Sequence, residues 1–129
     1  MSSIAAALRA EIVGCDIPGI TTKVYRDLAP PTTQYPYVTY ADHLNDKVAL
    51  TGDKKVLARN YMVQVDLWEK RIEETESNLT TITDCLENAT LVGTDNKVFR
   101  CRLVDTQRII QFDDDVVHHA ISLNIYRKV

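Results

Sequence analysis

Hydrophobic and polar residues alternate along three stretches of the chain, 61–68, 99–103 and 118–126. In the first of these, Val63, Val65 and Leu67 are separated by Gln64 and Asp66. A period of two is typical of a β-strand that buries one face and exposes the other, because successive side chains point to opposite sides. The pattern therefore predicts three half-buried strands.

A helical spacing marks two other stretches. Near the N-terminus, Ile4, Leu8 and Ile12 lie on one stripe that follows a serine capping residue and ends at Gly14. A longer stripe comprises Ile72, Leu79, Ile82, Leu86 and Ala89. Acidic residues near the start of this second stripe suit the positive end of a helix. We expect two amphipathic helices.

The connecting segments lack a stable period. Residues 23–28 predict a brief strand, the prolines of 29–36 predict an extended connection, and the tyrosines of 35–42 predict a strand that ends near Leu44. Residues 45–55, "NDKVALTGDKK", predict a long exposed loop or a flexible hairpin tip. The order of elements favours one α+β domain over residues 1–129, with a mainly antiparallel sheet and two helices packed on one face.

Composition narrows the class of protein. The net charge of −3 and the absence of a basic run give no general attraction to nucleic acid or to an anionic membrane surface. No stretch approaches the roughly 18 uninterrupted apolar residues of a membrane span, and the first residues do not resemble a secretory leader. Cys15, Cys85 and Cys101 have no paired spacing, so we expect buried free thiols in a reducing compartment.

The stretch "FDDDVVHHA" at residues 112–120 is the candidate for a metal site. Adjacent residues of a strand point to opposite faces, so His118 and His119 diverge and make a poor pair of ligands. Asp113, Asp114 and Asp115 suit a turn, and the alternating acids, glycine and distal glutamate of a calcium loop are missing. We expect no metal and no cofactor.

Other enzyme chemistry has equally little support. The chain has no G-x-S-x-G elbow and no glycine-rich phosphate loop. A Cys101 nucleophile served by His119 is disfavoured, because alternation sends Arg100 and Arg102 to the face opposite the thiol. A packed thiol is the favoured interpretation, and we expect no catalytic residues.

The outward face of the predicted sheet carries Met62, Trp68 and Tyr126 among polar residues. Aromatic residues, Met and Arg are enriched where proteins contact one another, so this face predicts a protein contact. A weaker alternative is a nucleic-acid face built from Tyr37, Tyr40, Tyr126, Arg100 and Arg102. The arginines can equally be cross-strand charge partners of Asp66.

The order of these landmarks resembles the tail terminator, or tail completion, proteins of long-tailed bacteriophages and related tailed particles. The likeness covers nearly the whole chain. Its most telling segments are "YPYVTY" at residues 35–40, "VQVDLW" at 63–68 and the final strand that ends in Ile125, Tyr126 and Arg127.

The resemblance implies a structural virion protein without catalytic residues. In that family a small α+β subunit assembles as a ring, generally a hexamer, on the head-proximal end of the tail tube, where it ends tube polymerisation and meets the head connector. The implied partners are copies of the chain itself, the tail tube protein and a connector or head-completion protein, with no membrane and no specific nucleic acid. The implied location is the tail-neck region of a virion whose proteins are made in the host cytoplasm.

Two sets of charged residues are inferred to make contacts in such a ring. Lys47, Asp53, Lys54 and Lys55 lie in the long exposed loop, and the turn at Asp113, Asp114 and Asp115 of the next subunit is one candidate for the lysines to meet. A neck or head-completion protein of the same particle remains an alternative. A metal-dependent enzyme or a nucleic-acid-binding module is a distant one.

Overall fold

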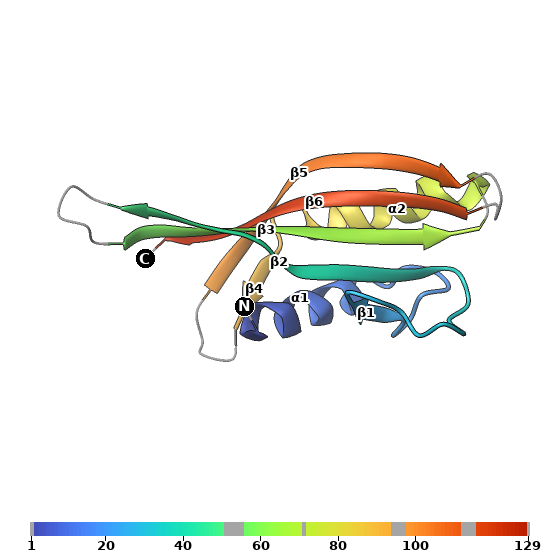
Figure 1. Cartoon of the computed structure of the whole chain (residues 1–129), viewed down its shortest axis with the longest axis horizontal. Coiled ribbons are helices and arrows are strands. Elements are labelled where there is room, and N and C mark those ends of the chain that lie inside the picture. Colours follow the sequence, from blue (N-terminus) through green and yellow to red (C-terminus); the bar gives the residue numbers. More distant parts are fainter. Residues whose placement is uncertain (1, 51–55, 71, 94–97, 112–115, 129) are drawn as a thin grey trace.

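The chain forms two helices and six strands, as seen in a computed structural model (Figure 1). The structure describes residues 2–50, 56–70, 72–93, 98–111 and 116–128, and only the backbone at 2–4, 42–50, 56–60, 72–76, 110–111 and 127–128. In chain order the elements are α1 (Ser2–Gly14), β1 (Val24–Arg26), β2 (Tyr37–Leu50), β3 (Val56–Glu69), α2 (Ile72–Leu86), β4 (Thr90–Val92), β5 (Val98–Gln111) and β6 (Val116–Lys128). No helix in the described part of the chain is long and apolar enough to cross a membrane.

The six described strands form one sheet in the order β1-β2-β3-β6-β5-β4. The expected architecture was mainly antiparallel, and the sheet is in fact mixed: β1 pairs with β2 in parallel, whereas the other described neighbours are antiparallel. A parallel pair needs a longer connection than a hairpin. The proline-rich segment between β1 and β2 supplies that length, and its Tyr35–Pro36 peptide is cis.

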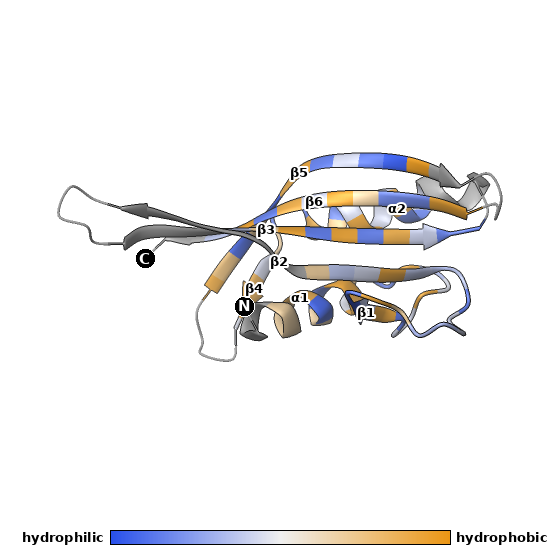
Figure 2. Cartoon of the chain, in the orientation of Figure 1, coloured by the Kyte–Doolittle hydropathy of each residue, from blue (hydrophilic) through white to orange (hydrophobic). Residues whose placement is uncertain are grey.

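Both helices pack on the same face of the sheet, as the hydrophobic stripes predict. Leu8 and Ile12 of α1 and Ile82 and Leu86 of α2 are each at most 1% exposed and belong to one core cluster. The strands contribute alternate residues to that core, including Val63, Val65, Leu67, Ile121, Leu123 and Ile125. Figure 2 shows the resulting alternation of hydrophobic and hydrophilic positions along β3. The other sheet face is not covered by either helix.

The expected loop at 45–55 is partly wrong. Its first half is strand: Asn45–Leu50 continues β2 and pairs with β3 from Met62 back to Val56. The remainder, residues 51–55, lies outside the described residues. We name the strand-paired segments 45–50 and 56–60 the arm, which projects beyond both helices (Figure 1).

The second half of the chain also holds more strand than its pattern predicts. β5 continues to Gln111, with a register shift between Leu103 and Asp105. β4 was not expected, and it pairs antiparallel with the start of β5. It follows Asn88, which has a φ of +61°; asparagine tolerates this left-handed conformation better than most residues and so suits the end of α2.

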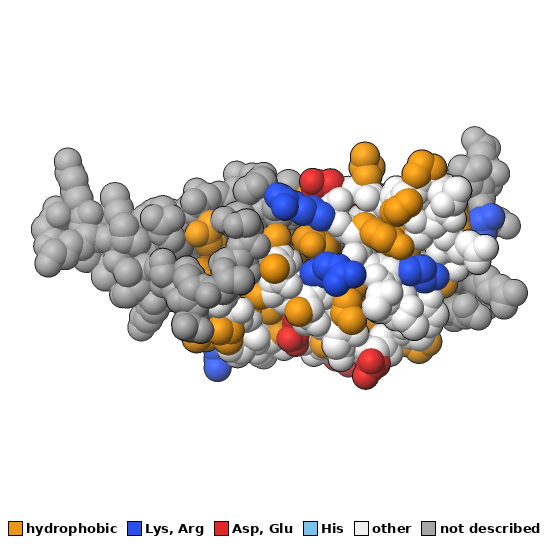
Figure 3. All heavy atoms as spheres, turned by 90° about the horizontal axis from the view of Figure 1, so that it is seen from below, with side chains coloured by type: hydrophobic (Ala, Val, Ile, Leu, Met, Phe, Trp, Pro, Cys, Tyr) orange, Lys and Arg blue, Asp and Glu red, His pale blue; other side chains and the backbone are white. Residues whose placement is uncertain are grey.

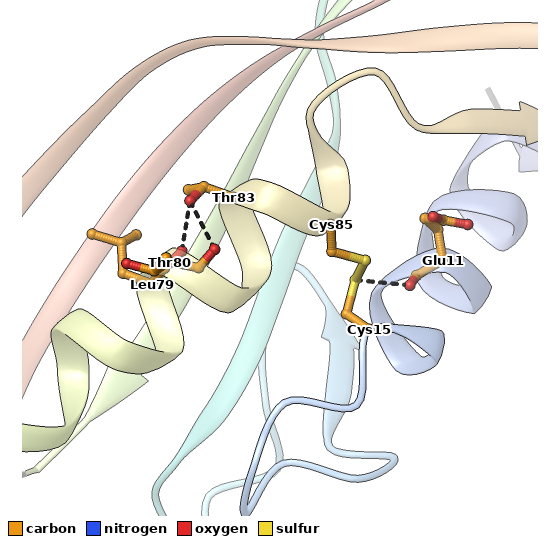
Figure 4. The surroundings of a disulfide bond; sticks show 6 residues. All are labelled: Glu11, Cys15, Leu79, Thr80, Thr83 and Cys85. Atoms are coloured by element: carbon orange, nitrogen blue, oxygen red, sulfur yellow. Dashed lines mark hydrogen bonds between the residues drawn. A yellow bond between two sulfur atoms is a disulfide. The ribbon is translucent and has the colours of Figure 1, made fainter.

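Cys15 and Cys85 form a disulfide, so the expectation of free thiols is wrong for these two residues (Figure 4). Their Cα atoms lie 5.8 Å apart, although 70 positions separate them in sequence. Packing of the end of α1 against α2 brings them together, which sequence spacing cannot reveal. The Sγ of Cys15 also lies 3.1 Å from the carbonyl oxygen of Glu11, where a reduced thiol would donate a hydrogen bond. Cys101 remains free and buried, as expected.

Candidate contact surface

The sheet face opposite the helices, here called the open face, gathers the half-buried side chains of the central strands. The register between β3 and β6 aligns Met62 with Asn124, Gln64 with Ser122, Asp66 with Ala120 and Trp68 with His118. Neighbours in such pairs stand on the same side of the sheet. Since Val63, Val65 and Leu67 are in the core, these alternate residues face away from it.

Four aromatic side chains cross one end of the open face, and we name them the aromatic row: Tyr35, Tyr37, Trp68 and His118. The Trp68 and His118 rings are 3.9 Å apart between centroids and stack at 9°. Tyr37 stacks with Trp68 at 6.1 Å, and Tyr35 lies 5.3 Å from Tyr37. Lys70 Nζ lies 5.6 Å from the centroid of the Tyr35 ring. The indole of Trp68 is therefore flanked along the row by two rings of its own chain, those of Tyr37 and His118.

Hydrogen bonds fix the polar atoms beside this row. Trp68 Nε1 donates to Thr39 Oγ1 at 3.0 Å. Asp66 Oδ1 accepts from Gln64 Nε2 at 2.8 Å and contacts His118 Nε2 at 2.6 Å. Burial, followed by the influence of the neighbouring Tyr35, raises the pKa of the Tyr37 hydroxyl, which therefore stays neutral at physiological pH. Stacking and hydrogen bonds thus engage the row within its own chain.

The predicted contact residues fall in two places on the open face. Trp68 is in the aromatic row, whereas Met62 lies about 20 Å along β3, at roughly 3.3 Å per residue. Tyr126 is near Met62, because it pairs with Asn60, which lies two residues before Met62 on β3. The face therefore offers two separate surfaces. Tyr35 and His118 were not predicted as members of the row. The register that sets Tyr37 and His118 beside Trp68 was the missing signal, and Tyr35 joins the row through Tyr37.

Of the remaining predicted contacts, Lys47 alone falls within the residues that the structure describes. Lys47 is in the β2 part of the arm, and Asp53, Lys54 and Lys55 lie outside the described residues. Asp113, Asp114 and Asp115 also lie outside them, between β5 and β6. The register puts the β5–β6 connection at the end of the sheet opposite the arm. Within one subunit Lys47 is thus separated by most of the length of the sheet from the ends of β5 and β6 at Gln111 and Val116.

The arginines and tyrosines of the nucleic-acid alternative do not share one surface. Arg100 aligns with Tyr126 and Arg102 with Asn124, so these residues lie on the open face. Tyr40 is only 4% exposed and packs in the core. Asp66 is also not the partner of Arg100 and Arg102, because β6 lies between β3 and β5. The carboxylate of Asp66 contacts His118 instead.

The described side chains give little support to a catalytic site. Cys101 is 1% exposed, and burial, with a smaller contribution from Glu11, raises its pKa to about 12, so the thiol stays protonated. It aligns with Ile125, whereas His119 lies six residues further along β6. His118 and His119 diverge as predicted, one on the open face and one 3% exposed on the helix side. No three metal-ligating side chains gather within the described residues.

Figure 3 views the molecule from the side on which α1 and β1 lie, where hydrophobic and basic side chains are interspersed. Two basic residues, Arg9 on α1 and Lys23 just before β1, donate hydrogen bonds within the chain. Arg9 donates from Nε to the carbonyl oxygen of Val24 at 3.1 Å and from Nη2 to that of Thr22 at 3.3 Å. Lys23 donates from Nζ to the carbonyl oxygen of Gln34 at 3.2 Å. These bonds hold α1 and the connection before β2 against the edge strand β1.

Comparison with solved structures shows that the whole fold recurs elsewhere. One chain, in a structure described as the virion of a native gene transfer agent particle, superposes with a TM-score of 0.69 over 100% of both chains at 16% identity. A second solved chain superposes with a TM-score of 0.65 at 12% identity, covering 99% of this chain and 94% of its own. At these identities the likeness establishes the fold alone.

Sequence comparison identifies the family. No curated protein matches the chain. The family described as "Tail completion protein gp17" matches residues 2–127, which is nearly the whole chain and includes the arm, the aromatic row and both helices. The chain therefore belongs to the tail completion protein gp17 family, whose members are structural proteins of the phage tail.

Proposed function

We propose that six copies of this protein form a ring at the head-proximal end of the phage tail tube. The ring ends polymerisation of the tube and joins the tail to the head connector. Membership of a tail completion family supports this role, as does the fold shared with a chain of a gene transfer agent virion. The partners are neighbouring copies, the tail tube protein and the connector.

The observation that carries this proposal is the arm. Asn45–Leu50 and Val56–Asn60 are paired with one another, yet they project beyond the helix layer that covers the rest of the sheet (Figure 1). Within the arm β6 also pairs with β3, but only at Ala58–Asn60, so the arm is a narrow ribbon of two to three strands. A narrow ribbon without a covering layer is only marginally stable in water. Such an extension is therefore suited to a partner that covers it in the assembled particle.

The open face supplies a second contact region. Met62 and Tyr126 are half-buried and lie near the base of the arm, away from the aromatic row. Residues of these types are enriched at protein interfaces. We assign this pair, rather than Trp68, to intermolecular contact, because the neighbours of Trp68 along the aromatic row are its own chain's Tyr37 and His118.

A closed ring requires unlike surfaces of neighbouring subunits to meet repeatedly until the rotation closes. The proposal is tested by imaging purified particles in which this protein carries a label. We expect six labels around the tail axis where the tube meets the neck. A label on the head side of the connector would instead support a head-completion role, and particles without ring density for this chain would refute the proposal.

Reversing the charges of Lys47, Lys54 and Lys55 should impair assembly without impairing folding. Changing Lys47, Lys54 and Lys55 to Glu is expected to alter the free energy of unfolding by no more than about 0.5 kcal/mol, as for substitutions outside a core. Like charges forced together at an interface can cost several kcal/mol. We therefore expect the variant to melt normally and to be poorly incorporated into particles in a complementation assay.

The matched control changes the same three lysines to Arg, which keeps the charge and should preserve incorporation. Normal infectivity of the Glu variant would show that these three lysines make no essential contact. A large fall in its melting temperature would show that these positions belong to the folded core instead.

A further inference from the structure

Part of β5 has an unpaired outer edge. The outer edge of its first half is covered: β4 pairs with Val98–Arg100, the Cys101 N–H donates to the Ala89 carbonyl at 2.9 Å, and the Leu103 N–H donates to Glu87 Oε2 at 2.8 Å. From Val104 to Gln111, β6 lies on one side, and no strand of the described chain pairs on the other (Figure 1).

The opposite edge of the sheet has a similar stretch in β2. There, β1 covers only Val38–Tyr40. From Ala41 to Leu50, β3 lies on one side, and the described residues supply no strand on the other. The two stretches have similar lengths, and each leaves a row of backbone donors and acceptors directed outward.

An open edge is a template for pairing with another chain, and monomeric proteins usually protect it with charged side chains, especially lysine, with proline, with a β-bulge or with a covering segment. Here the bulge lies at the start of the β5 stretch, and the charged residues of the stretch are Asp105 and Arg108. The β5 stretch "VDTQRIIQ" contains neither lysine nor proline. Its apolar residues Val104 and Ile109 are 55% and 38% exposed. These properties are typical of a strand that pairs in the assembled state.

We propose that the outer edge of β5 in one subunit pairs with the outer edge of β2 in the next, so that one sheet continues around the ring. This inference rests on the proposed ring and names its lateral contact. The strands β2, β3, β6 and β5 alternate in direction. Because their number is even, the β2 of a following subunit meets β5 antiparallel, and the alternation can repeat until the ring closes.

The outward backbone groups can be identified on both edges. The Thr106 N–H donates to Asp105 Oδ1 at 2.8 Å rather than to β6, so alternation directs the Arg108 and Ile110 groups outward as well. On β2, Val38 donates to the Lys23 carbonyl across the β1 edge. The β2–β3 register continues past its shift after Ala41, and it directs the backbone groups of Asp46, Val48 and Leu50 outward.

One register satisfies these constraints and places Arg108 opposite Asp46. In this register, outward backbone groups of β5 face outward backbone groups of β2. The register also keeps both residues on the helix side of the sheet, since Arg108 aligns with the buried His119 and Asp46 aligns with Tyr61, which packs against the core. Opposite charges in directly facing positions favour an antiparallel pair.

This register is compatible with closure. Within one subunit, Arg108 and Asp46 are offset along the strand direction by about six residues, or ~20 Å. The four strand spacings from the β2 of one subunit to the β2 of the next amount to ~19 Å. Joining Arg108 and Asp46 without a rise along the ring axis tilts the strands by about 45°, and strands in closed barrels tilt by roughly 35–45°. The two open edges are offset by an amount that a closed sheet can accommodate.

A proline at position 108 tests the shared edge. Arg108→Pro removes an outward N–H, and proline is tolerated on an edge strand where that group faces solvent. We expect the isolated variant to keep its melting temperature but to be incorporated into particles at least roughly tenfold less than Arg108→Ala, since a loss of about 1.4 kcal/mol at a contact suffices for a factor of ten. Equal incorporation of the two variants would overturn the proposal.

Charge exchange tests the register and the partner strand. Arg108→Glu should reduce incorporation by placing two carboxylates opposite each other. Asp46→Arg in the same chain should restore it, because every contact of the ring then carries the reversed pair. Failure of the double variant to exceed both single variants would refute β2 as the partner of β5. Rings that contain all these variants equally would leave the ring proposal standing and remove the edge pairing, whereas wild-type particles without rings would remove both.

Discussion

Unfolding under reducing conditions is expected to require about 2–4 kcal/mol less free energy than unfolding with the Cys15–Cys85 disulfide intact. The bond links positions separated by 70 residues, so it closes more than half of the chain into a loop. A long loop restricts the unfolded ensemble strongly, and the chain-entropy estimate for this length is about 4 kcal/mol. Urea titrations with and without dithiothreitol measure the difference.

The matched control replaces both Cys15 and Cys85 by Ser. Its stability should resemble that of the reduced wild-type protein and should not respond to dithiothreitol. Thiol titration in urea without reductant should find one reactive thiol per wild-type chain, that of Cys101. Three reactive thiols would show that the bond does not form in the isolated protein and would restore the expectation based on sequence spacing.

Elements with one buried face were predictable from the sequence. The alternation in β3 and β6 exists because their odd-numbered residues pack beneath α1 and α2, where a polar side chain would be costly to bury. The stripe of α1 has the same cause, with Leu8 and Ile12 almost fully buried. For these segments, burial and sequence pattern are two consequences of one constraint.

Strand segments without a buried face were missed. Residues 104–109 are strand, and every residue from Val104 to Ile109 is exposed on one side of the sheet or the other. Backbone pairing defines such segments, and it imposes no period on side chains that are not buried.

Contacts between distant segments were predictable only in part. The outward position of Met62, Trp68 and Tyr126 followed from alternation, and the register confirms it. The aromatic row did not follow, because it needs Tyr37 aligned with Trp68 on one side and His118 on the other. Strand order and register determine these neighbours, and one sequence without its fold specifies neither.

Replacing Trp68 by Ala is expected to destabilise the subunit by about 2–3 kcal/mol, somewhat below the cost for a fully buried tryptophan. The indole stacks on His118 at 3.9 Å and donates a hydrogen bond to Thr39 at 3.0 Å. Both interactions hold neighbouring strands of the same chain together. The substitution removes them and leaves Asp66 and His118 more exposed to water.

Trp68→Phe separates the two contributions, because it keeps an aromatic ring for stacking and loses the hydrogen bond, at an expected cost of about 1 kcal/mol. Met62→Ala is the matched control on the same strand and the same face. Because Met62 is assigned to intermolecular contact, Met62→Ala should impair particle incorporation more than stability. Trp68→Ala should lower both in proportion. Urea unfolding of the isolated variants, compared with their incorporation under conditions where each is fully folded, provides the measurement. If Trp68→Ala unfolds like the wild type and yet fails to assemble, the aromatic row is an intermolecular contact, and its structural role is refuted.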